Sequence, residues 1–256
     1  MKHIISFLFV FLLTSCFTVQ VFSSVRLFDS YGINLGFNTF QLLGNLSSVQ
    51  SQIVSDNSTH SGGGLRFIES GFDIGATFFV DSNLQHRVIL GSESIWMNSK
   101  EVRSVSSLVY AYSQHKVQFT NFYLGYHFVF WNAPFQDVKI YSGAEMMLNN
   151  ITLNELERGI TYLQNSSSNS AITYKKDATT RIGGRVRAGF EGRLYEQLFI
   201  NASFTLGFYN LLLRNNSTGE LFNSVNSDET KESLQPFFNY LISFQYRFEK
   251  NKRNEK

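Results

Sequence analysis

Hydrophobic residues alternate with small polar residues along several stretches of the chain. The clearest stretch is residues 31–40, in which Tyr31, Ile33, Leu35 and Phe37 alternate with glycine and asparagine. Successive side chains of a β-strand point to opposite faces, so these four side chains share one face. The stretch therefore predicts a strand with one apolar face and one small, polar face.

The same pattern occurs eight times. The six clear runs are residues 31–40, 71–80, 121–131, 181–191, 198–209 and 238–248, and the two weaker runs are residues 86–97 and 138–148. A tilted strand needs about 9–11 residues to cross a bilayer, and these runs are long enough. The expected fold is all-β: an eight-stranded antiparallel up-and-down transmembrane β-barrel whose apolar faces contact lipid.

A secreted, soluble β-sandwich is the alternative fold, because its strands also alternate. In a sandwich the polar faces would meet water, where Lys and Glu usually gather. Here the polar faces are rich in Gly, Ser, Asn and Thr with isolated charges, while the apolar faces are almost unbroken and strongly aromatic. This composition favours a narrow, filled barrel interior.

The connections between the runs alternate in length. The expected long connections are residues 44–64, 98–116, 149–180 and 214–234, and the short ones are residues 81–85, 132–137 and 193–197. Outer-membrane barrels have short periplasmic turns and long extracellular loops. We therefore expect an integral protein of a bacterial outer membrane, with both chain ends in the periplasm.

The N-terminus has the features of an export signal. Lys2 and His3 precede an apolar run over residues 4–13, which is too short to span a bilayer as a helix. Cleavage after Ser23 is one possibility; the other is a lipoprotein-type site at Cys16, the single cysteine. We divide the chain into a signal peptide (1–23), a barrel (24–248) and a charged periplasmic tail (249–256).

Composition limits the partners and the chemistry. Aromatic residues make up 16% of the chain, which suits a protein that presents apolar surface to lipid. The net charge of +2 gives no reason to expect a nucleic-acid partner. We expect no cofactor, no metal site and a monomer, whose external ligand or protein partner the sequence does not indicate.

Ionisable residues on the inward faces form a candidate polar network in the lumen. They are Asp73, Glu93, His127, Glu145, Arg181, Arg185, Arg187, Glu191 and Arg247. Unpaired buried charges are costly, so a plug of salt bridges is the expected arrangement, with Glu145 near Arg185 and Arg187. A catalytic His127 with Glu145 is the competing interpretation. It lacks a serine beside His127, and we expect no enzyme.

Aromatic residues near the expected strand ends have two further candidate roles. One is an interfacial girdle at the headgroup level, formed by Trp96, Trp131, Tyr195, Tyr209 and Tyr246. The other is a C-terminal signal for the barrel-assembly machinery, formed by Phe244, Tyr246 and Phe248. The expected partners are therefore outer-membrane lipid, lipopolysaccharide and, during biogenesis, that machinery.

Three segments carry a resemblance to a known group of proteins. They are residues 71–79 (Gly-Phe-Asp-Ile-Gly-Ala-Thr-Phe-Phe), residues 139–145 (Lys-Ile-Tyr-Ser-Gly-Ala-Glu) and residues 182–213. They resemble the small outer-membrane barrels of Bacteroidota, of the OmpA/OmpX-like or PorT-like type. The resemblance implies an outer-membrane location and an eight-stranded barrel, but no single activity.

The expected function is structural or binding, through the long extracellular loops, with a plugged lumen. A narrow channel for small solutes, an accessory barrel of a secretion machine, and a soluble binding protein with a sandwich fold remain alternatives.

Overall fold

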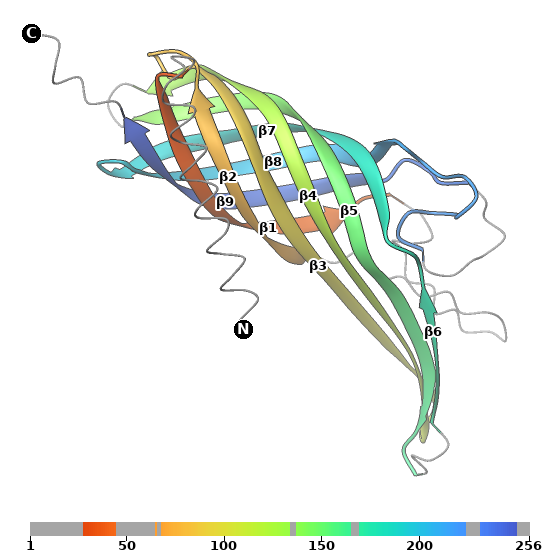
Figure 1. Ribbon diagram of the computed structural model, residues 1–256. Coiled ribbons are helices and arrows are strands. Elements are labelled where there is room, and N and C mark those ends of the chain that lie inside the picture. The colour runs from red at the N-terminus through yellow and green to blue at the C-terminus, as the bar shows by residue number, and fades with distance from the viewer. Residues whose placement is uncertain are drawn as a thin grey trace, which may run out of the picture.

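The computed structural model describes residues 28–44, 65, 68–133, 137–164, 169–223 and 231–249. These residues form nine strands in one sheet (Figure 1). The strands are β1 (Ser30–Leu42), β2 (Glu69–Phe79), β3 (His86–Ser106), β4 (Val109–Ala133), β5 (Val138–Tyr162), β6 (Ser170–Lys175), β7 (Thr179–Tyr195), β8 (Leu198–Leu212) and β9 (Pro236–Glu249). Among the described residues, no helix is long and apolar enough to span a bilayer.

Eight of these strands close into a ring. The order is β1-β2-β3-β4-β5-β7-β8-β9, and the pairing of β1 with β9 closes the barrel. Every pairing in the ring is antiparallel. Apart from the β1–β9 closure and the β5–β7 pair, each pairing joins two strands that are consecutive in the chain. The expected eight-stranded up-and-down barrel is confirmed, and β6 is a short ninth strand that pairs only with β5 among the described strands.

The alternating pattern places side chains as expected. On β1, Leu35 and Phe37 are exposed, Phe37 to 73%, while Asn38 on the opposite face is buried. On β9, Ile242 and Phe244 face outward, and Ser243, Gln245 and Arg247 are buried inside. The outer surface is therefore a belt of exposed Phe, Leu, Ile, Val and Tyr, which is the arrangement of a barrel surrounded by lipid.

The two ends of the barrel differ. β1 begins and β9 ends at one end, together with the turns at residues 81–85 and 196–197; we call this the turn end. At the first of these turns, Asp81 accepts hydrogen bonds from the backbone N–H groups of Gln85 (2.9 Å) and His86 (2.7 Å). The opposite end, which we call the loop end, carries the connection between β8 and β9.

Two of the expected long loops are wrong, because strands continue through them. Residues 98–116 were expected to be a loop, but β3 continues to Ser106, β4 begins at Val109, and only two residues connect them. Residues 149–180 were also expected to be a loop, but β5 continues to Tyr162 and β6 adds to its edge. The polar sequence hid these extensions because both faces of a solvated sheet can carry polar residues.

The extensions form one feature, which we call the arm: residues 98–106 of β3, 109–116 of β4, 154–162 of β5, and β6. Within it β4 pairs with β3 and β5, and β5 pairs with β6. Figure 1 shows β3, β4 and β5 running without a break from the barrel into the arm, well past the other strands. The arm is thus a four-stranded sheet beyond the loop end.

Inside the barrel, the loop end is closed by an apolar cluster that alternation did not predict. Its members are Phe40, Leu42, Leu65, Ile89, Ile95, Met97, Val117, Phe119, Tyr123, Met147, Ile151, Tyr209, Leu221, Phe222 and Phe237. Leu65, Leu221 and Phe222 come from outside the strands and are almost fully buried. We call the part of this cluster around Phe40, Phe119, Tyr209, Phe222 and Phe237 the apolar cap.

Several expectations lie outside the described residues. These are the signal peptide (1–23), the alternative site at Cys16, most of the 44–64 connection, residues 134–136 and residues 250–256 of the expected tail. The connection over residues 214–234 is confirmed where it is described, since β8 ends at Leu212 and β9 begins at Pro236.

Candidate functional site

The structure places all nine residues of the expected lumen network inside the barrel. Each is buried, with no more than 5% of its surface exposed: Asp73, Glu93, His127, Glu145, Arg181, Arg185, Arg187, Glu191 and Arg247. They come from β2, β3, β4, β5, β7 and β9, so the network is assembled across most of the ring. Together with Glu232, these residues form three groups, around Glu145 and Glu93, around Glu191 and around Glu232, while Asp73 pairs with Tyr123.

Glu145 on β5 is the centre of the middle group. Arg185, directly opposite on β7, forms an ion pair with it through Nε, and Arg187 Nε lies 2.7 Å from Glu145 Oε1. His127 Nε2, from β4, lies 2.9 Å from the same oxygen. One carboxylate thus holds three side chains from both neighbouring strands.

Glu93 on β3 connects this group to the other side of the lumen. Arg185 Nη1 lies 2.5 Å from Glu93 Oε1, so Arg185 bridges two glutamates. The side-chain amides of Asn38, Asn121 and Asn239 donate to the same carboxylate at 3.0, 2.9 and 3.3 Å. Short amide side chains from β1, β4 and β9 therefore complete a network that crosses the lumen.

Glu191 organises the group at the turn end. Arg87 lies 2.9 Å and Arg247 2.6 Å from its two carboxylate oxygens. Both guanidinium groups also lie against aromatic rings: Arg247 is 3.8 Å from the centre of the Phe199 ring and 4.4 Å from that of Phe79. Cation–π contacts to these buried guanidinium groups supplement the single carboxylate that the two arginines share.

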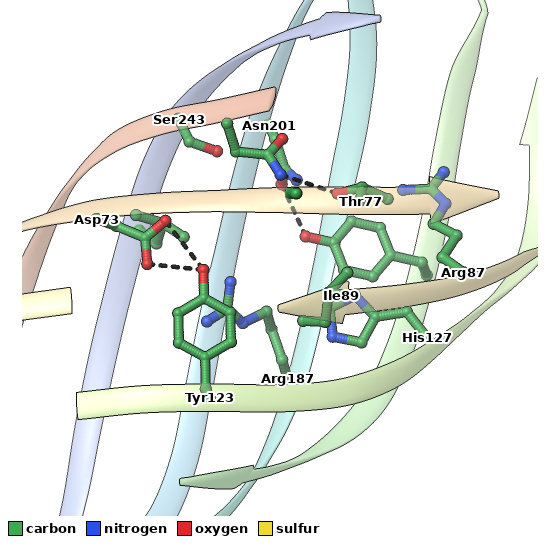
Figure 2. Close-up of a pocket in the computed structure, with 13 residues that line it drawn as sticks. Asp73, Thr77, Arg87, Ile89, Tyr123, His127, Arg187, Asn201 and Ser243 are labelled. Atoms are coloured by element: carbon green, nitrogen blue, oxygen red, sulfur yellow. Dashed lines mark hydrogen bonds between the residues drawn. The ribbon is translucent and has the colours of Figure 1, made fainter. Parts of the chain in front are cut away.

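Asp73 has a different environment. Tyr123 donates its hydroxyl to both carboxylate oxygens, at 3.0 and 3.2 Å (Figure 2). The tyrosine ring can reach across because Gly91 lies beneath it: a Cβ at Gly91 would lie 2.4 Å from the Tyr123 hydroxyl oxygen. Glycine is therefore required here for the close approach of a side chain.

A small cavity lies beside Asp73 and Tyr123. Its volume is about 20 Å³, and Thr77, Arg87, His127, Arg187, Asn201 and Ser243 are among the residues that line it (Figure 2). A space of this size holds about one water molecule. Around this cavity, buried polar side chains of the described strands point into the lumen, among them Asn38, Asn121, Asn149, Asn239 and Gln245.

The third group closes the loop end. Glu232, from the connection between β8 and β9, accepts from Arg181 Nε at 2.8 Å and from Arg181 Nη2 at 2.6 Å. Asn210 Nδ2 and the backbone N–H of Asn215 donate to the same carboxylate at 2.7 and 2.8 Å. These bonds hold the connection over the barrel, where Phe222 packs into the apolar cap.

The sequence interpretation missed Arg87, Lys139 and Glu232. Arg87 and Lys139 lie within the two weak runs, and following the alternation back from Glu93 to Arg87 and from Glu145 to Lys139 would have placed both inside. Glu232 lies in a connection without periodicity, so no sequence signal marked it. Its role depends on how that connection folds back onto Arg181.

Four of the five residues of the expected aromatic girdle are exposed near the ends of the barrel strands. Trp96 is exposed toward the loop end, and Trp131, Tyr195 and Tyr246 are exposed toward the turn end. Tyr209 is wrong: it is 1% exposed and stacks on Phe237 inside the barrel, with ring centres 4.3 Å apart. The strand alternation turns its side chain inward, into the apolar cap.

The arm presents a different surface from the barrel. On the face that continues the outer barrel surface, Tyr112 donates to Glu157 at 2.7 Å, and Lys175 pairs with Glu155 at 2.5 Å. Exposed apolar side chains cluster toward its far end: Val102, Val105, Leu108, Ile160, Tyr162, Leu163 and Ile172. The surface of the arm thus mixes polar and apolar groups, unlike the apolar belt of the barrel.

The arrangement of charged side chains in the lumen is that of a packed structural network. The Glu145 oxygen beside His127 also pairs with Arg187, and the His127 ring stacks on Tyr141 with centres 5.1 Å apart. Within the described residues, no group of three or more His, Cys, Asp or Glu side chains is arranged to hold a metal ion. These side chains pack and neutralise one another.

No protein-family model and no curated protein sequence matches the chain. Solved structures that are similar include neisserial surface protein A, at 12% identity and a TM-score of 0.46, covering 85% of this chain and 97% of that one. The attachment invasion locus protein of Yersinia pestis has 10% identity and a TM-score of 0.36, covering 86% and 99%. The outer membrane protein OprG of Pseudomonas aeruginosa has 11% identity and a TM-score of 0.37, covering 87% and 97%.

Likeness at this level carries no argument about function, and the location follows from the chain's own geometry. The ring of eight strands is closed, its outer surface is a belt of exposed apolar side chains, and its interior holds the charges. Only a closed barrel satisfies all its backbone hydrogen bonds in lipid when the chain crosses as strands. This chain is a small integral outer-membrane β-barrel protein.

Proposed function

We propose that the protein is a plugged outer-membrane anchor that displays the arm for binding outside the cell. One contrast supports this most directly: many buried charged and amide side chains occupy the described lumen, whereas three ring strands continue past the barrel into a sheet. A conducting protein needs a passage, and these paired side chains would obstruct one. A binding protein needs an exposed surface, and the arm would supply one.

Charge pairing makes the plug a stable one. Glu93, Glu145, Glu191 and Glu232 each contact at least one arginine, and Glu93 also accepts from three asparagines. Opening a path for solutes would separate these groups in a region of low dielectric constant, which costs several kcal/mol per uncompensated charge. The apolar cap would have to open as well.

The proposal also assigns an orientation. Short turns and both barrel termini would face the periplasm, and the arm would project from the cell surface, as in other outer-membrane barrels. The aromatic side chains at the two ends would lie at the headgroup level, with lipopolysaccharide around the loop end. Phe244, Tyr246 and Phe248 would serve the barrel-assembly machinery, and the narrower likeness to Bacteroidota barrels of the OmpA/OmpX-like or PorT-like type stays a prediction.

Planar-bilayer recording of the purified protein tests the plug. We expect no channel events of uniform size, because the lumen side chains and the apolar cap both block the path. Uniform, reproducible steps would contradict the proposal and favour the narrow channel. A general porin added to the same bilayer is the control that shows that events would be detected.

Labelling on intact cells tests the display of the arm. Cysteine replaces Lys175, which is exposed on the arm, or Glu196, which is exposed at the turn end. A membrane-impermeant maleimide should label the Lys175→Cys variant on intact cells, and the Glu196→Cys variant only after the outer membrane is permeabilised. The reverse pattern would contradict the orientation and the proposed function with it.

A further inference from the structure

Three consecutive leucines are exposed where β8 ends. Leu211, Leu212 and Leu213 have 41%, 58% and 59% of their surface exposed. Leu212 lies opposite Ile182 of β7, and Ile182 lies opposite Leu148 of β5, whose side chain is exposed on the outer surface. Directly opposite residues of a strand pair point to the same face. The leucines therefore continue the apolar belt of the barrel at the loop end.

The end of β8 departs from regular alternation. Ile182 pairs with Leu212 but Gly184 pairs with Phe208, so over this interval β8 contains two more residues than β7. Such bulges redirect side chains. Leu213 then has a left-handed backbone, with a φ of 63°, which is uncommon for a residue with a bulky side chain. In a regular strand at least one of three consecutive leucines would point into the barrel, whereas here all three are exposed.

Two cationic residues lie next to these leucines. Arg214 follows Leu213 directly, and Lys231 precedes Glu232 in the connection between β8 and β9, which extends from the loop end (Figure 1). The backbone N–H of Asn215 donates to the Glu232 carboxylate at 2.8 Å, so this bond joins the two segments that carry the cations. Both cationic side chains are exposed. The fold thus brings two positive charges together where the apolar belt ends.

A groove lies between the leucines and the cations, and we call it the leucine groove. Leu211, Leu212, Leu213, Arg214, Asn216 and Lys231 line it, and its volume is about 530 Å³. This volume is in the range of sites that bind small molecules. Since part of its lining is apolar and part is cationic, a complementary ligand has an apolar portion and a negatively charged group.

The position of the groove indicates what this ligand is. Apolar belt residues of a barrel contact acyl chains, and residues just beyond the belt lie at the level of the lipid headgroups. In the proposed orientation the loop end faces outward, where the lipid of a bacterial outer membrane is lipopolysaccharide. Its acyl chains are attached to a sugar headgroup that carries phosphates. Arginine and lysine bind phosphate through charge-assisted hydrogen bonds.

We propose that the leucine groove binds one lipopolysaccharide molecule, with an acyl chain against Leu211, Leu212 and Leu213 and a headgroup phosphate between Arg214 and Lys231. The inference rests on the proposed orientation and assigns a ligand to the barrel itself, separate from any partner of the arm. The same connection carries Glu232, which accepts from Arg181 over the lumen. The bound lipid therefore also stabilises the closure of the loop end.

Lipid binding in detergent tests the phosphate contact. The purified full chain is titrated with deep-rough lipopolysaccharide in a non-ionic detergent, and bound lipid is counted by native mass spectrometry. One molecule should bind per chain, and Arg214→Gln and Lys231→Gln should each weaken binding by about tenfold, because each removes a charge-assisted hydrogen bond. Arg193→Gln removes the same charge from an exposed pair at the turn end and should bind as the wild type does. Equal binding by all four proteins would overturn the proposal.

The chemistry of the lipid provides a second comparison. Dephosphorylated lipopolysaccharide should bind the wild-type protein about tenfold more weakly than the intact lipid, and Arg214→Gln should weaken this residual binding no further. Phosphatidylglycerol, a phosphate lipid with two acyl chains, should bind more weakly than intact lipopolysaccharide. Unchanged binding after removal of the phosphates, or tighter binding of phosphatidylglycerol, would refute the assignment.

Leu212→Asn tests the apolar wall of the groove. The Leu212 side chain is exposed, so its replacement leaves no internal cavity, and the variant should still shift on boiling in a detergent gel. It should bind lipopolysaccharide more weakly than the wild type, since less apolar surface is available to the acyl chain. Leu194→Asn is the matched control, with a leucine that is 52% exposed at the turn end. Equal binding by the two variants would contradict the acyl-chain contact.

Failure of this inference is distinguishable from failure of the proposed function. Labelling of the Lys175→Cys and Glu196→Cys variants reports the orientation without reference to any lipid. If the labelling is as expected but binding does not depend on Arg214 and Lys231, the leucine groove is wrongly assigned and the display of the arm stands. If the labelling is reversed, the loop end faces the periplasm, and the assignment to lipopolysaccharide fails with the orientation.

Discussion

At the scale of single residues, the barrel interior depends on shared carboxylates. Glu145 interacts with Arg185, Arg187 and His127, so its loss would leave Arg187 without its ion-pair partner and Arg185 with Glu93 alone. Removing one partner of a buried ion pair costs far more than the net contribution of the pair, because the remaining charge stays buried. The middle of the barrel should therefore be sensitive to substitutions that barely change shape.

Glu145→Gln tests this sensitivity. We expect the free energy of unfolding in lipid vesicles, measured by denaturant titration, to fall by about 3–5 kcal/mol. Glu155→Gln is the matched control: the same change in the exposed pair with Lys175 should cost less than about 1 kcal/mol. Similar losses in the two variants would show that the Glu145 interactions add nothing beyond a surface pair.

Sequence alone predicted most of the lumen residues and one set of their pairings, that of Glu145 with Arg185 and Arg187. Alternation gave the direction of every member of the network on a strand, since a strand has only two faces. The girdle role of Tyr209 is wrong because it was inferred from a position near a strand end, whereas the alternation places this side chain on the inward face. Alternation could not place Glu232, whose contact with Arg181 joins a loop to a strand.

At the scale of elements, the arm consists of strand segments that hydrophobic periodicity does not predict. In the ring, lipid on one side and the packed lumen on the other force two unlike faces, and the alternation follows. In the arm much of the surface meets water, so residues 98–116 and 149–180 carry polar groups in both positions and look like loops. The register of β3 with β4 nevertheless continues unbroken from His86 to Ser104.

His115 makes the base of the arm sensitive to pH. It is buried on β4 between Ser99 of β3 and Leu156 of β5, and its Nε2 lies 2.9 Å from Asn154 Oδ1. Burial lowers the pKa of His115 from 6.5 to about 4. The unfolded arm therefore takes up a proton as the pH falls through 6.5, whereas the folded arm does not do so until about pH 4. Stability is complete above pH 6.5 and declines between these values.

Hydrogen exchange measures this effect. Protection of the arm amides, corrected for the intrinsic rate, should correspond to an opening free energy that falls by up to about 3 kcal/mol between pH 7 and pH 4. His115→Gln keeps a side chain able to bond to Asn154 but does not titrate in this range, so its profile should be flatter. A wild-type profile as flat as that of His115→Gln would contradict the assignment.

At the scale of the whole molecule, the ring and the arm use the same strands but different sources of stability. The ring is closed by hydrogen bonds between every neighbouring pair and filled by the lumen network and the apolar cap. The arm adds pairings among β3, β4, β5 and β6 only, and none of them is needed to close the ring. The ring should therefore fold without the end of the arm.

Shortening the β3–β4 hairpin tests this independence. Replacing residues 101–113 with an Asn-Gly turn joins Lys100 to Gln114, which are already opposite each other, and a two-residue Asn-Gly loop matches the twist of a hairpin. The shortened protein should still shift on boiling in a detergent gel and remain in the membrane fraction. Because the β1–β9 closure and the glutamate-centred groups are untouched, a shortened chain that did not fold would mean that the arm nucleates the barrel, and the division into anchor and display surface would be wrong.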